Sequence, residues 1–194
     1  MTALSAATLV TVTGNPKAGS RTLSAAVALG AALTDRFRSD AGVDLDPAPA
    51  GPIDLATIAD GLLAPWRLSP AAVEATETVR SASVLVLATP TYKASYTGLL
   101  KLFLDTFPAG SLAGTVVVPL TVAGGPAHRH LADLQLRPVL GELGAALPAP
   151  SLLLEEADLA DLPAVVAAYA DRHAAVIGAT AAALRPLANL VGRP

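Results

Sequence analysis

The sequence contains no cysteine and is poor in charged and aromatic residues. Without cysteine there can be no disulfide, no thiolate metal ligand and no thiol nucleophile, so the protein classes that depend on them are excluded. Only 15% of the residues are charged, against a usual share of about 25%. A surface with so little charge is typical of subunits that bury apolar area against each other, and we therefore expect a homo-oligomer.

The chain also lacks a basic segment and a long apolar run. Its net charge is −3, from 13 Lys and Arg against 16 Asp and Glu. Binding to phosphodiester backbones needs a positive surface, so we expect no nucleic acid partner. The longest apolar runs are about half as long as a membrane span, and residues 1–10 lack the positive start of a secretory signal. These absences predict a cytoplasmic protein that does not enter a membrane.

The segments that are present alternate between two kinds. Short apolar runs that end in turn signals lie at 8–13, 42–46 (a weak one), 83–88, 115–120 and 151–155. Segments with helical periodicity lie at 20–36, 70–81, 96–107, 128–143 and 163–184. Most of the short runs are apolar throughout, as strands buried on both faces are. The alternation predicts an α/β fold, a doubly wound five-stranded parallel sheet with helices on both faces.

The length of 194 residues suits one domain, which we place at 1–185 with a tail at 186–194. Two local features need a separate interpretation. Proline removes a hydrogen bond from a sheet, so we expect Pro119 at the exit of its strand. The segment 47–70 is rich in Pro, Gly and Ala, and we interpret it as an excursion after the second strand with no clear chemistry.

Ligands of open α/β sheets bind beyond the carboxyl ends of the strands, so the loops after the first, third and fourth runs matter most. The first of these loops contains Gly14 and Gly19 and leads into a helix through Ser20, Arg21 and Thr22. Free amides at a helix N-terminus, two hydroxyls and an arginine fork are typical of a phosphate cradle. The alternative is that Ser20 only caps the helix and Arg21 is solvated.

Two common nucleotide motifs are absent. The glycine spacing of the first loop imitates a triphosphate-binding loop, but Ser20 and Arg21 replace its Lys and Ser or Thr, and no apolar run ends in an Asp for magnesium. The G-x-G-x-x-G fingerprint of dinucleotide binding is also missing. A single phosphate is therefore the better interpretation than a nucleoside triphosphate or a dinucleotide.

The second loop contains Pro90, Thr91, Tyr92 and Lys93. Proline stiffens the exit of the strand, while Thr91 and Tyr92 can offer backbone amides and a flat side chain to a planar heteroaromatic ring. The alternative is an ordinary turn in which Tyr92 and Tyr96 pack as amphipathic surface.

The third loop contains the pair Gly124 and Gly125, which lets backbone amides approach a ligand closely ahead of a helix start. His128 and His130 are two residues apart and point to different helix faces, so we expect no metal. A phosphate cradle, a ring platform and a glycine pair at one sheet edge together predict a flavin mononucleotide (FMN) site. The sequence has no G-x-S-x-G elbow and no obvious paired carboxylates, so we expect no catalytic acid, base or nucleophile.

The sequence also resembles a known family. The stretches G-N-P-K-A-G-S-R-T, A-T-P-T-Y-K-A-S-Y-T-G-L-L-K-L-F-L-D and G-G-P-A-H are similar to those of NAD(P)H-dependent FMN reductases. The similarity is greatest to the two-component branch that supplies reduced flavin to alkanesulfonate monooxygenases. That branch often has an extra aromatic residue in the helix after the glycine pair, where this chain has Asp133, Leu134 and Gln135.

The resemblance implies a flavodoxin-like fold with strand order 2-1-3-4-5, and a homodimer or homotetramer. It further implies that Ser20, Arg21 and Thr22 hold the phosphate. By the same resemblance, the segment from Pro90 through Thr91 and Tyr92 to Lys93 lies against the isoalloxazine, and Gly124 and Gly125 face its pyrimidine edge.

Two functions remain open on the sequence. The first is an enzyme that passes a hydride from NADPH or NADH to FMN, for a partner monooxygenase or to reduce quinones or azo dyes. The second is a flavodoxin-like electron carrier that does not turn over nicotinamide. Carriers are usually strongly acidic for docking on basic partners, and a net charge of −3 favours the enzyme.

Overall fold

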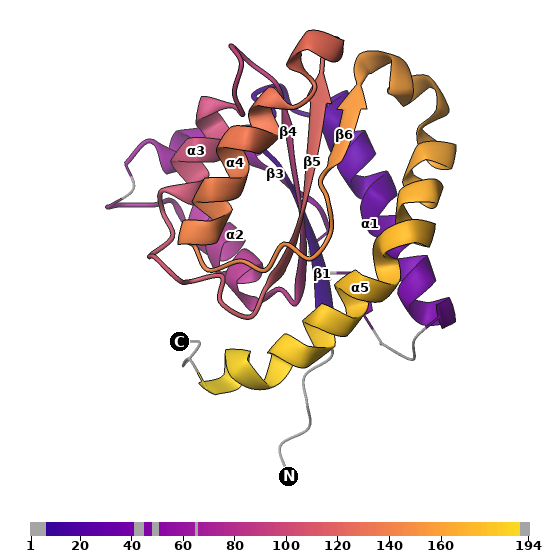
Figure 1. Ribbon diagram of the computed structural model, residues 1–194. Helices are drawn as coiled ribbons and strands as arrows, with labels where there is room; N and C mark the ends of the chain where they lie inside the picture. Colours follow the sequence, from indigo (N-terminus) through magenta and orange to yellow (C-terminus); the bar gives the residue numbers. More distant parts are fainter. Residues whose placement is uncertain (1–6, 41–44, 48–50, 65, 191–194) are drawn as a thin grey trace.

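A parallel β-sheet forms the centre of the computed structural model, which describes residues 7–40, 45–47, 51–64 and 66–190 (Figure 1). The strands are β1 (Ala7–Thr13), β2 (Leu45–Pro47), β3 (Ile53–Asp54), β4 (Val84–Pro90), β5 (Val116–Ala123) and β6 (Leu152–Glu155). The order is β2-β1-β4-β5-β6, and β3 also pairs with β1. All pairings are parallel. Counted over the five predicted strands, this is the order 2-1-3-4-5, so the flavodoxin-like fold is confirmed.

Helices cover both faces of the sheet (Figure 1). They are α1 (Arg21–Asp40), α2 (Pro70–Ser81), α3 (Gly98–Leu104), α4 (Leu131–Glu142) and α5 (Leu162–Leu190). Short 3₁₀ turns are η1 (Leu55–Thr57), η2 (Ala59–Leu62), η3 (Pro126–His128) and η4 (Glu156–Asp161). The helices α1 and α5 pack on one face and α2, α3 and α4 on the other. The backbone of 186–190, which we expected in the tail, continues α5.

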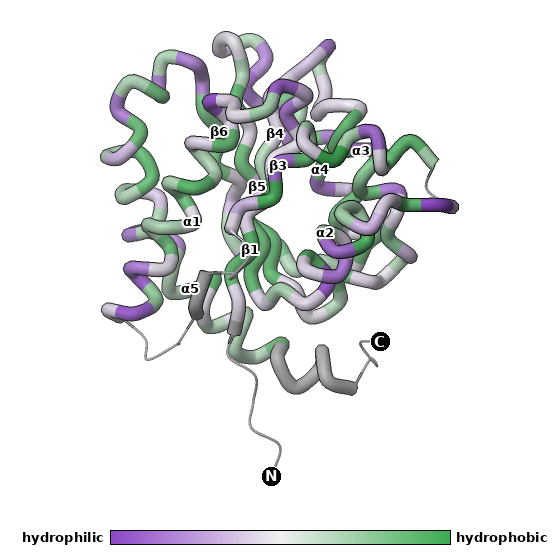
Figure 2. The backbone as a smooth tube through the Cα atoms, turned by 180° about the vertical axis from the view of Figure 1, so that it is seen from behind, coloured by the Kyte–Doolittle hydropathy of each residue, from purple (hydrophilic) through white to green (hydrophobic). Residues whose placement is uncertain are grey.

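The core consists of two clusters, one on each face of the sheet. Successive side chains of a strand point to opposite faces, so Val86 packs with Phe37 of α1 while Leu87 packs with Phe103 of α3. Every residue of β4 and β5 is buried. This burial explains why these runs are apolar throughout, and Figure 2 shows the hydrophobic residues gathered along the central strands.

The expectation that Pro119 ends its strand is wrong, because β5 continues to Ala123. The reason is a gap in the neighbouring strand. The amide of Val117 donates toward the β6 side, to the carbonyl of Ala146 at 2.9 Å, and the amide direction alternates along a strand. The nitrogen of Pro119 therefore faces that same side, where β6 pairing begins only at Leu120 with Leu152. The missing N–H falls where no ladder bond is available.

The second strand occurs in two pieces on the same side of β1. We predicted it at 42–46, of which 42–44 lie outside the described residues, and β2 begins at Leu45. Its continuation β3 pairs beside Val12 and Thr13 at the carboxyl end of β1. No helix of the described chain is long and apolar enough to cross a membrane.

Candidate functional site

The loops after β1, β4 and β5 start at the same edge of the sheet, as expected for parallel strands. Backbone hydrogen bonds tie the first and the second loop each to the next strand of the sheet. The amide of Gly14 donates to the carbonyl of Ala88 at 2.8 Å, and that of Thr91 donates to the carbonyl of Val122 at 2.8 Å. The structure therefore brings the three predicted loops together.

The first loop ends in a capped helix start. Gly19 has φ +62°, a conformation that a glycine adopts without strain, and it turns the chain into α1. The hydroxyl of the buried Ser20 accepts from the amide of Leu23 at 3.2 Å. The buried hydroxyl of Thr22 accepts from the side-chain amide of Asn15 at 3.1 Å. Both hydroxyls thus have structural partners, and for Ser20 the capping alternative is the one observed.

The backbone amides of this helix start remain available. No acceptor among the described residues takes a hydrogen bond from the amide of Arg21 or Thr22. Free amides in the first turn are the usual anion-binding groups of an α-helix. The helix start therefore presents the unpaired backbone amides on which the predicted phosphate cradle depends, and the cradle itself stays a prediction.

Two carboxylates that the sequence did not single out lie against this cradle. The carboxylate of Asp54, at the end of β3, accepts from the amide of Gly19 at 2.9 Å and from the amide of Ala56 at 3.2 Å. Glu156, directly after β6, accepts from the Nη2 of Arg21 at 2.9 Å. Arg21 is thus exposed but ion-paired, and Asp54 belongs to the segment 47–70, which we interpreted as having no clear chemistry.

The second loop closes in a tight turn after β4. Tyr92 and Ser95 exchange backbone hydrogen bonds of 2.8 and 3.0 Å. The two central residues, Lys93 and Ala94, have φ of 49° and 63°. These values are typical of a type I′ turn, which favours Asn and Gly, so the turn stores strain. Strained backbone of this kind clusters at functional sites.

A side chain of α4 holds the turn in place. The Gln135 side chain donates from Nε2 to the carbonyl of Ala94 at 3.0 Å and accepts at Oε1 from the hydroxyl of Ser95 at 2.7 Å. The Tyr92 ring stays 50% exposed. The sequence marked Gln135 only as a departure from a relative's pattern, because nothing in helical spacing shows which loop a helix residue reaches.

The third loop lies open at the edge. A Cβ built on Gly124 or Gly125 meets no heavy atom within 4 Å, so packing does not require a glycine at either position. The next cation, Arg129, is turned away from the loop and donates to the carbonyl of Leu153 at 3.1 Å and to Glu155 at 3.3 Å. In the described part of the chain no three His, Asp or Glu side chains are grouped to hold a metal ion.

Three buried threonine hydroxyls of β1, β5 and the second loop lack a hydrogen-bond partner within the described chain. The hydroxyl oxygens of Thr13, Thr91 and Thr121 are buried and have no hydrogen-bond partner among the described residues. Each unsatisfied buried hydroxyl costs about 1 to 3 kcal/mol. Thr91 belongs to the predicted ring platform, but its hydroxyl oxygen is covered by the protein itself, as is that of Ser111 outside the three loops.

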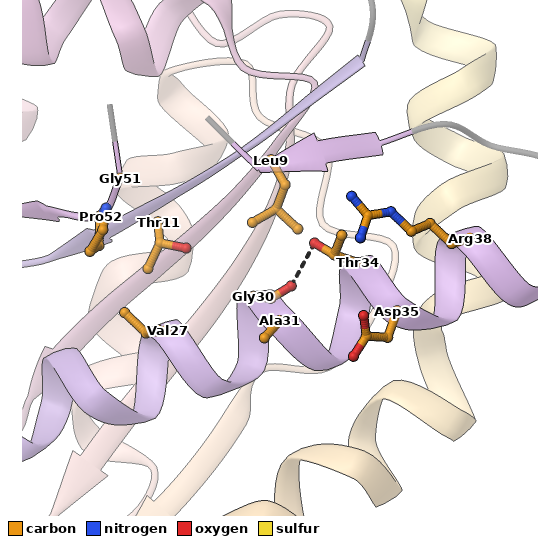
Figure 3. Close-up of a pocket in the computed structure, with 10 residues that line it drawn as sticks. All are labelled: Leu9, Thr11, Val27, Gly30, Ala31, Thr34, Asp35, Arg38, Gly51 and Pro52. Atoms are coloured by element: carbon orange, nitrogen blue, oxygen red, sulfur yellow. Dashed lines mark hydrogen bonds between the residues drawn. The ribbon is translucent and has the colours of Figure 1, made fainter. Parts of the chain in front are cut away.

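A cavity of about 260 Å³ lies elsewhere, between α1, β1 and Pro52 (Figure 3). Its β1 residues are Leu9 and Thr11, and its α1 lining reaches Arg38 near the end of that helix. Because Thr11 precedes the carboxyl end of β1, this cavity is separate from the three loops.

Comparisons with known proteins agree with this geometry. Residues 7–159 match the model of the family described as NADPH-dependent FMN reductase. An FMN reductase (NADPH) of Escherichia coli strain K12 is 47% identical over 77 residues, which are 40% of each chain. The NADH-dependent FMN reductase SfnE of Pseudomonas putida is 32% identical over 84% of this chain and 85% of its own length. An oxidoreductase structure from Corynebacterium diphtheriae superposes with a TM-score of 0.75 and 26% identity over 88% of this chain and 96% of that one.

Proposed function

Because the chain belongs to the NADPH-dependent FMN reductase family, we propose that it catalyses hydride transfer from NADPH or NADH to FMN. The single observation that carries the proposal is the meeting of three loops at the carboxyl edge of the sheet, one of them a helix start with free amides and an arginine. The match to the family over residues 7–159 includes all three loops.

The phosphate of FMN would bind at the start of α1. Its donors would be the amides of Ser20, Arg21 and Thr22 together with the Arg21 guanidinium. The two hydroxyls act indirectly, since Ser20 caps the helix and Thr22 fixes Asn15 of the same loop. In this arrangement the backbone amides and Arg21 bind the phosphate, whereas the simplest interpretation of the sequence has the hydroxyls themselves as phosphate donors.

The ring of FMN would lie against the segment from Pro90 through Thr91 and Tyr92 to Lys93, with its pyrimidine edge toward Gly124 and Gly125. Exposed amides of the glycine pair would stabilise negative charge on that edge.

The protein's part in the reaction is to bind and orient. When bound, FMN supplies the redox chemistry by accepting a hydride from the nicotinamide. The Gln135 clamp keeps the strained turn and its tyrosine in position, and no side chain needs to act as acid or base.

The partners are flavin and nicotinamide nucleotides, and we propose a flavin-dependent monooxygenase as acceptor if the reduced flavin leaves. This last step depends on the resemblance to two-component reductases. A homodimer or homotetramer is the assembly we propose from the low charge of the surface.

Anaerobic mixing tests the proposal. Adding NADPH or NADH to protein with FMN should bleach the flavin absorbance faster than in buffer alone. FMN binding without bleaching by either nicotinamide would contradict the enzyme and support the electron carrier. A useful control is riboflavin, which lacks the phosphate and should bind more weakly while remaining reducible.

A further inference from the structure

Two donors at the start of α1, beside the free amides of Arg21 and Thr22, are already in use within the chain. The amide of Gly19 donates to Asp54 at 2.9 Å, and the Arg21 guanidinium donates to Glu156 at 2.9 Å. The two acceptors come from opposite sides of β1 in the sheet, after β3 and after β6. A phosphate that uses the same donors has to replace both carboxylates or lie beside them.

We propose that Asp54 and Glu156 are internal competitors of the flavin phosphate and weaken the binding of FMN to this protein. The inference rests on the proposed function and concerns how tightly the same site binds its ligand. A dianionic phosphate repels each carboxylate, and binding has to break or loosen two charge-assisted hydrogen bonds.

Arg21 and Glu156 are exposed, which favours an ion pair that opens and closes over one that stays closed. The side chains of Arg21 and Glu156 are 68% and 54% exposed, so water can replace either partner while the pair opens. An exposed ion pair contributes only about 0 to 1 kcal/mol. The Arg21–Glu156 pair is therefore weak enough for a phosphate to displace.

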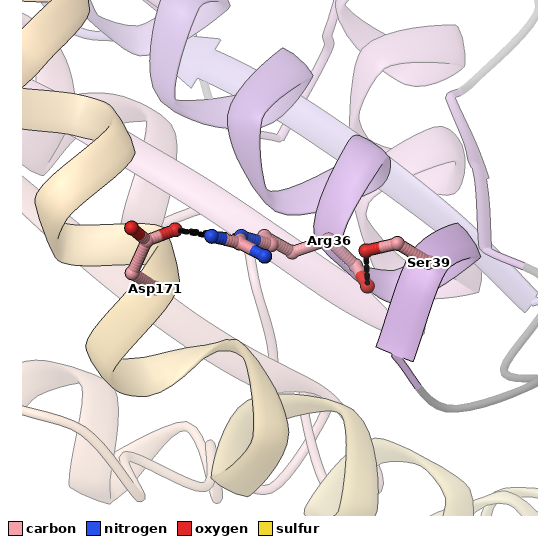
Figure 4. Close-up of polar contacts among 3 residues, drawn as sticks. All are labelled: Arg36, Ser39 and Asp171. Carbon is pink, nitrogen blue, oxygen red and sulfur yellow. Dashed lines mark hydrogen bonds and ion pairs between the residues drawn. The ribbon is translucent and has the colours of Figure 1, made fainter.

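Another ion pair on the same helix provides a matched comparison. Arg36 of α1 donates to Asp171 of α5 from Nε at 2.6 Å, and Ser39 donates to the Arg36 carbonyl (Figure 4). Arg36 lies about 22 Å from Arg21 along the helix at 1.5 Å per residue. That separation exceeds the Debye length of about 8 Å at physiological salt, so the charge of Asp171 has little influence on the cradle.

The experiment measures equilibrium binding of FMN and of riboflavin by flavin fluorescence. The variants are Asp54→Asn, Glu156→Gln, the double variant and the control Asp171→Asn. An asparagine can keep only one of the two hydrogen bonds of Asp54, because the Gly19 amide donates to Oδ2 and the Ala56 amide to Oδ1. A glutamine oxygen can still accept from Arg21, so Glu156→Gln removes the charge and keeps the hydrogen bond. Thermal unfolding of each variant checks that the fold is retained.

The proposal predicts that each single variant lowers the Kd for FMN by roughly twofold to fivefold, as expected for one exposed charge. The double variant should bind FMN more tightly still, riboflavin binding should not change, and Asp171→Asn should behave as the unaltered protein. Unchanged or weaker FMN binding in both single variants would overturn the proposal and leave the proposed function standing. Equal tightening of riboflavin would also overturn it, because the phosphate would then not be involved. Absence of binding of either flavin to every form would overturn both.

Discussion

Arg21 occupies the first position of α1, where one guanidinium serves two anions. In the structure it pairs with Glu156, and in the proposed complex it takes a phosphate oxygen. The backbone around it is fixed by side chains with no ligand role, since Ser20 caps the helix and Asn15 bonds to Thr22. At this scale the cradle is preorganised by its neighbours, and the groups that have to exchange partners are Arg21 and the Gly19 amide.

Replacing Arg21 by alanine should therefore weaken FMN binding without unfolding the protein. The side chain is 68% exposed, so we expect the lower end of the range for a charge-assisted hydrogen bond, about 1.5 kcal/mol or roughly tenfold in Kd. Titration with FMN and riboflavin measures the change, and Arg36→Ala on the same helix is the control. Equal losses for both flavins would mean that Arg21 is structural.

At the scale of structural elements, the turn after β4 most strongly shapes the part of the site that we assign to the flavin ring. Its central residues have positive φ although neither is glycine, and α4 holds it through Gln135. The backbone strain and the hydrogen bonds from Gln135 both act on the four-residue turn from Tyr92 to Ser95. The conformation of the turn is therefore maintained by tertiary contacts and is not what its own sequence favours.

Ala94→Gly should stabilise the protein, because glycine adopts φ near 63° without the steric cost that alanine has there. The expected gain in free energy of unfolding is about 1 kcal/mol. Denaturant unfolding measures it. Ala18→Gly, in the exposed first loop, is the matched control and should not stabilise, since positive φ among described non-glycine residues occurs only at Lys93 and Ala94. A destabilised Ala94→Gly variant would contradict the account of the turn.

Gln135→Ala removes both hydrogen bonds of the clamp and should loosen the turn. We expect the Kd for FMN and for riboflavin to rise together by roughly fivefold, corresponding to about 1 kcal/mol for lost preorganisation. The neighbouring Leu134→Ala is the control, because that side chain is 65% exposed and has no part in the clamp. A loss confined to FMN would contradict the assignment of this turn to the ring.

Elements could be predicted from the sequence wherever the pattern is local. The segment 70–81 was predicted as a helix with the bounds found for α2, and the buried central strands followed from uniform apolar runs. Pro119 was placed wrongly because its tolerance depends on where β6 starts, which no local pattern contains. Asp54, Glu156 and Gln135 were missed as site residues for the same reason, since each acts on a loop distant in the sequence.

For the whole molecule, the low charge and the exposed apolar side chains point to association. Leu63, Trp66 and Leu134 are 70%, 86% and 65% exposed. Large apolar side chains in water are common at surfaces that bind another subunit. We expect light scattering at micromolar concentration to give a mass of at least twice 19.4 kDa. A mass near 19.4 kDa would contradict the expected homo-oligomer.

For the whole molecule, we propose above all that one edge of the sheet binds FMN and presents it to a nicotinamide. The most direct test follows the loss of NADPH or NADH absorbance in air, with catalytic protein and increasing FMN. The account predicts a rate above that of buffer, which saturates with FMN and falls at low FMN in Arg21→Ala. A rate equal to that of buffer with both nicotinamides, in a preparation that binds FMN, would contradict it.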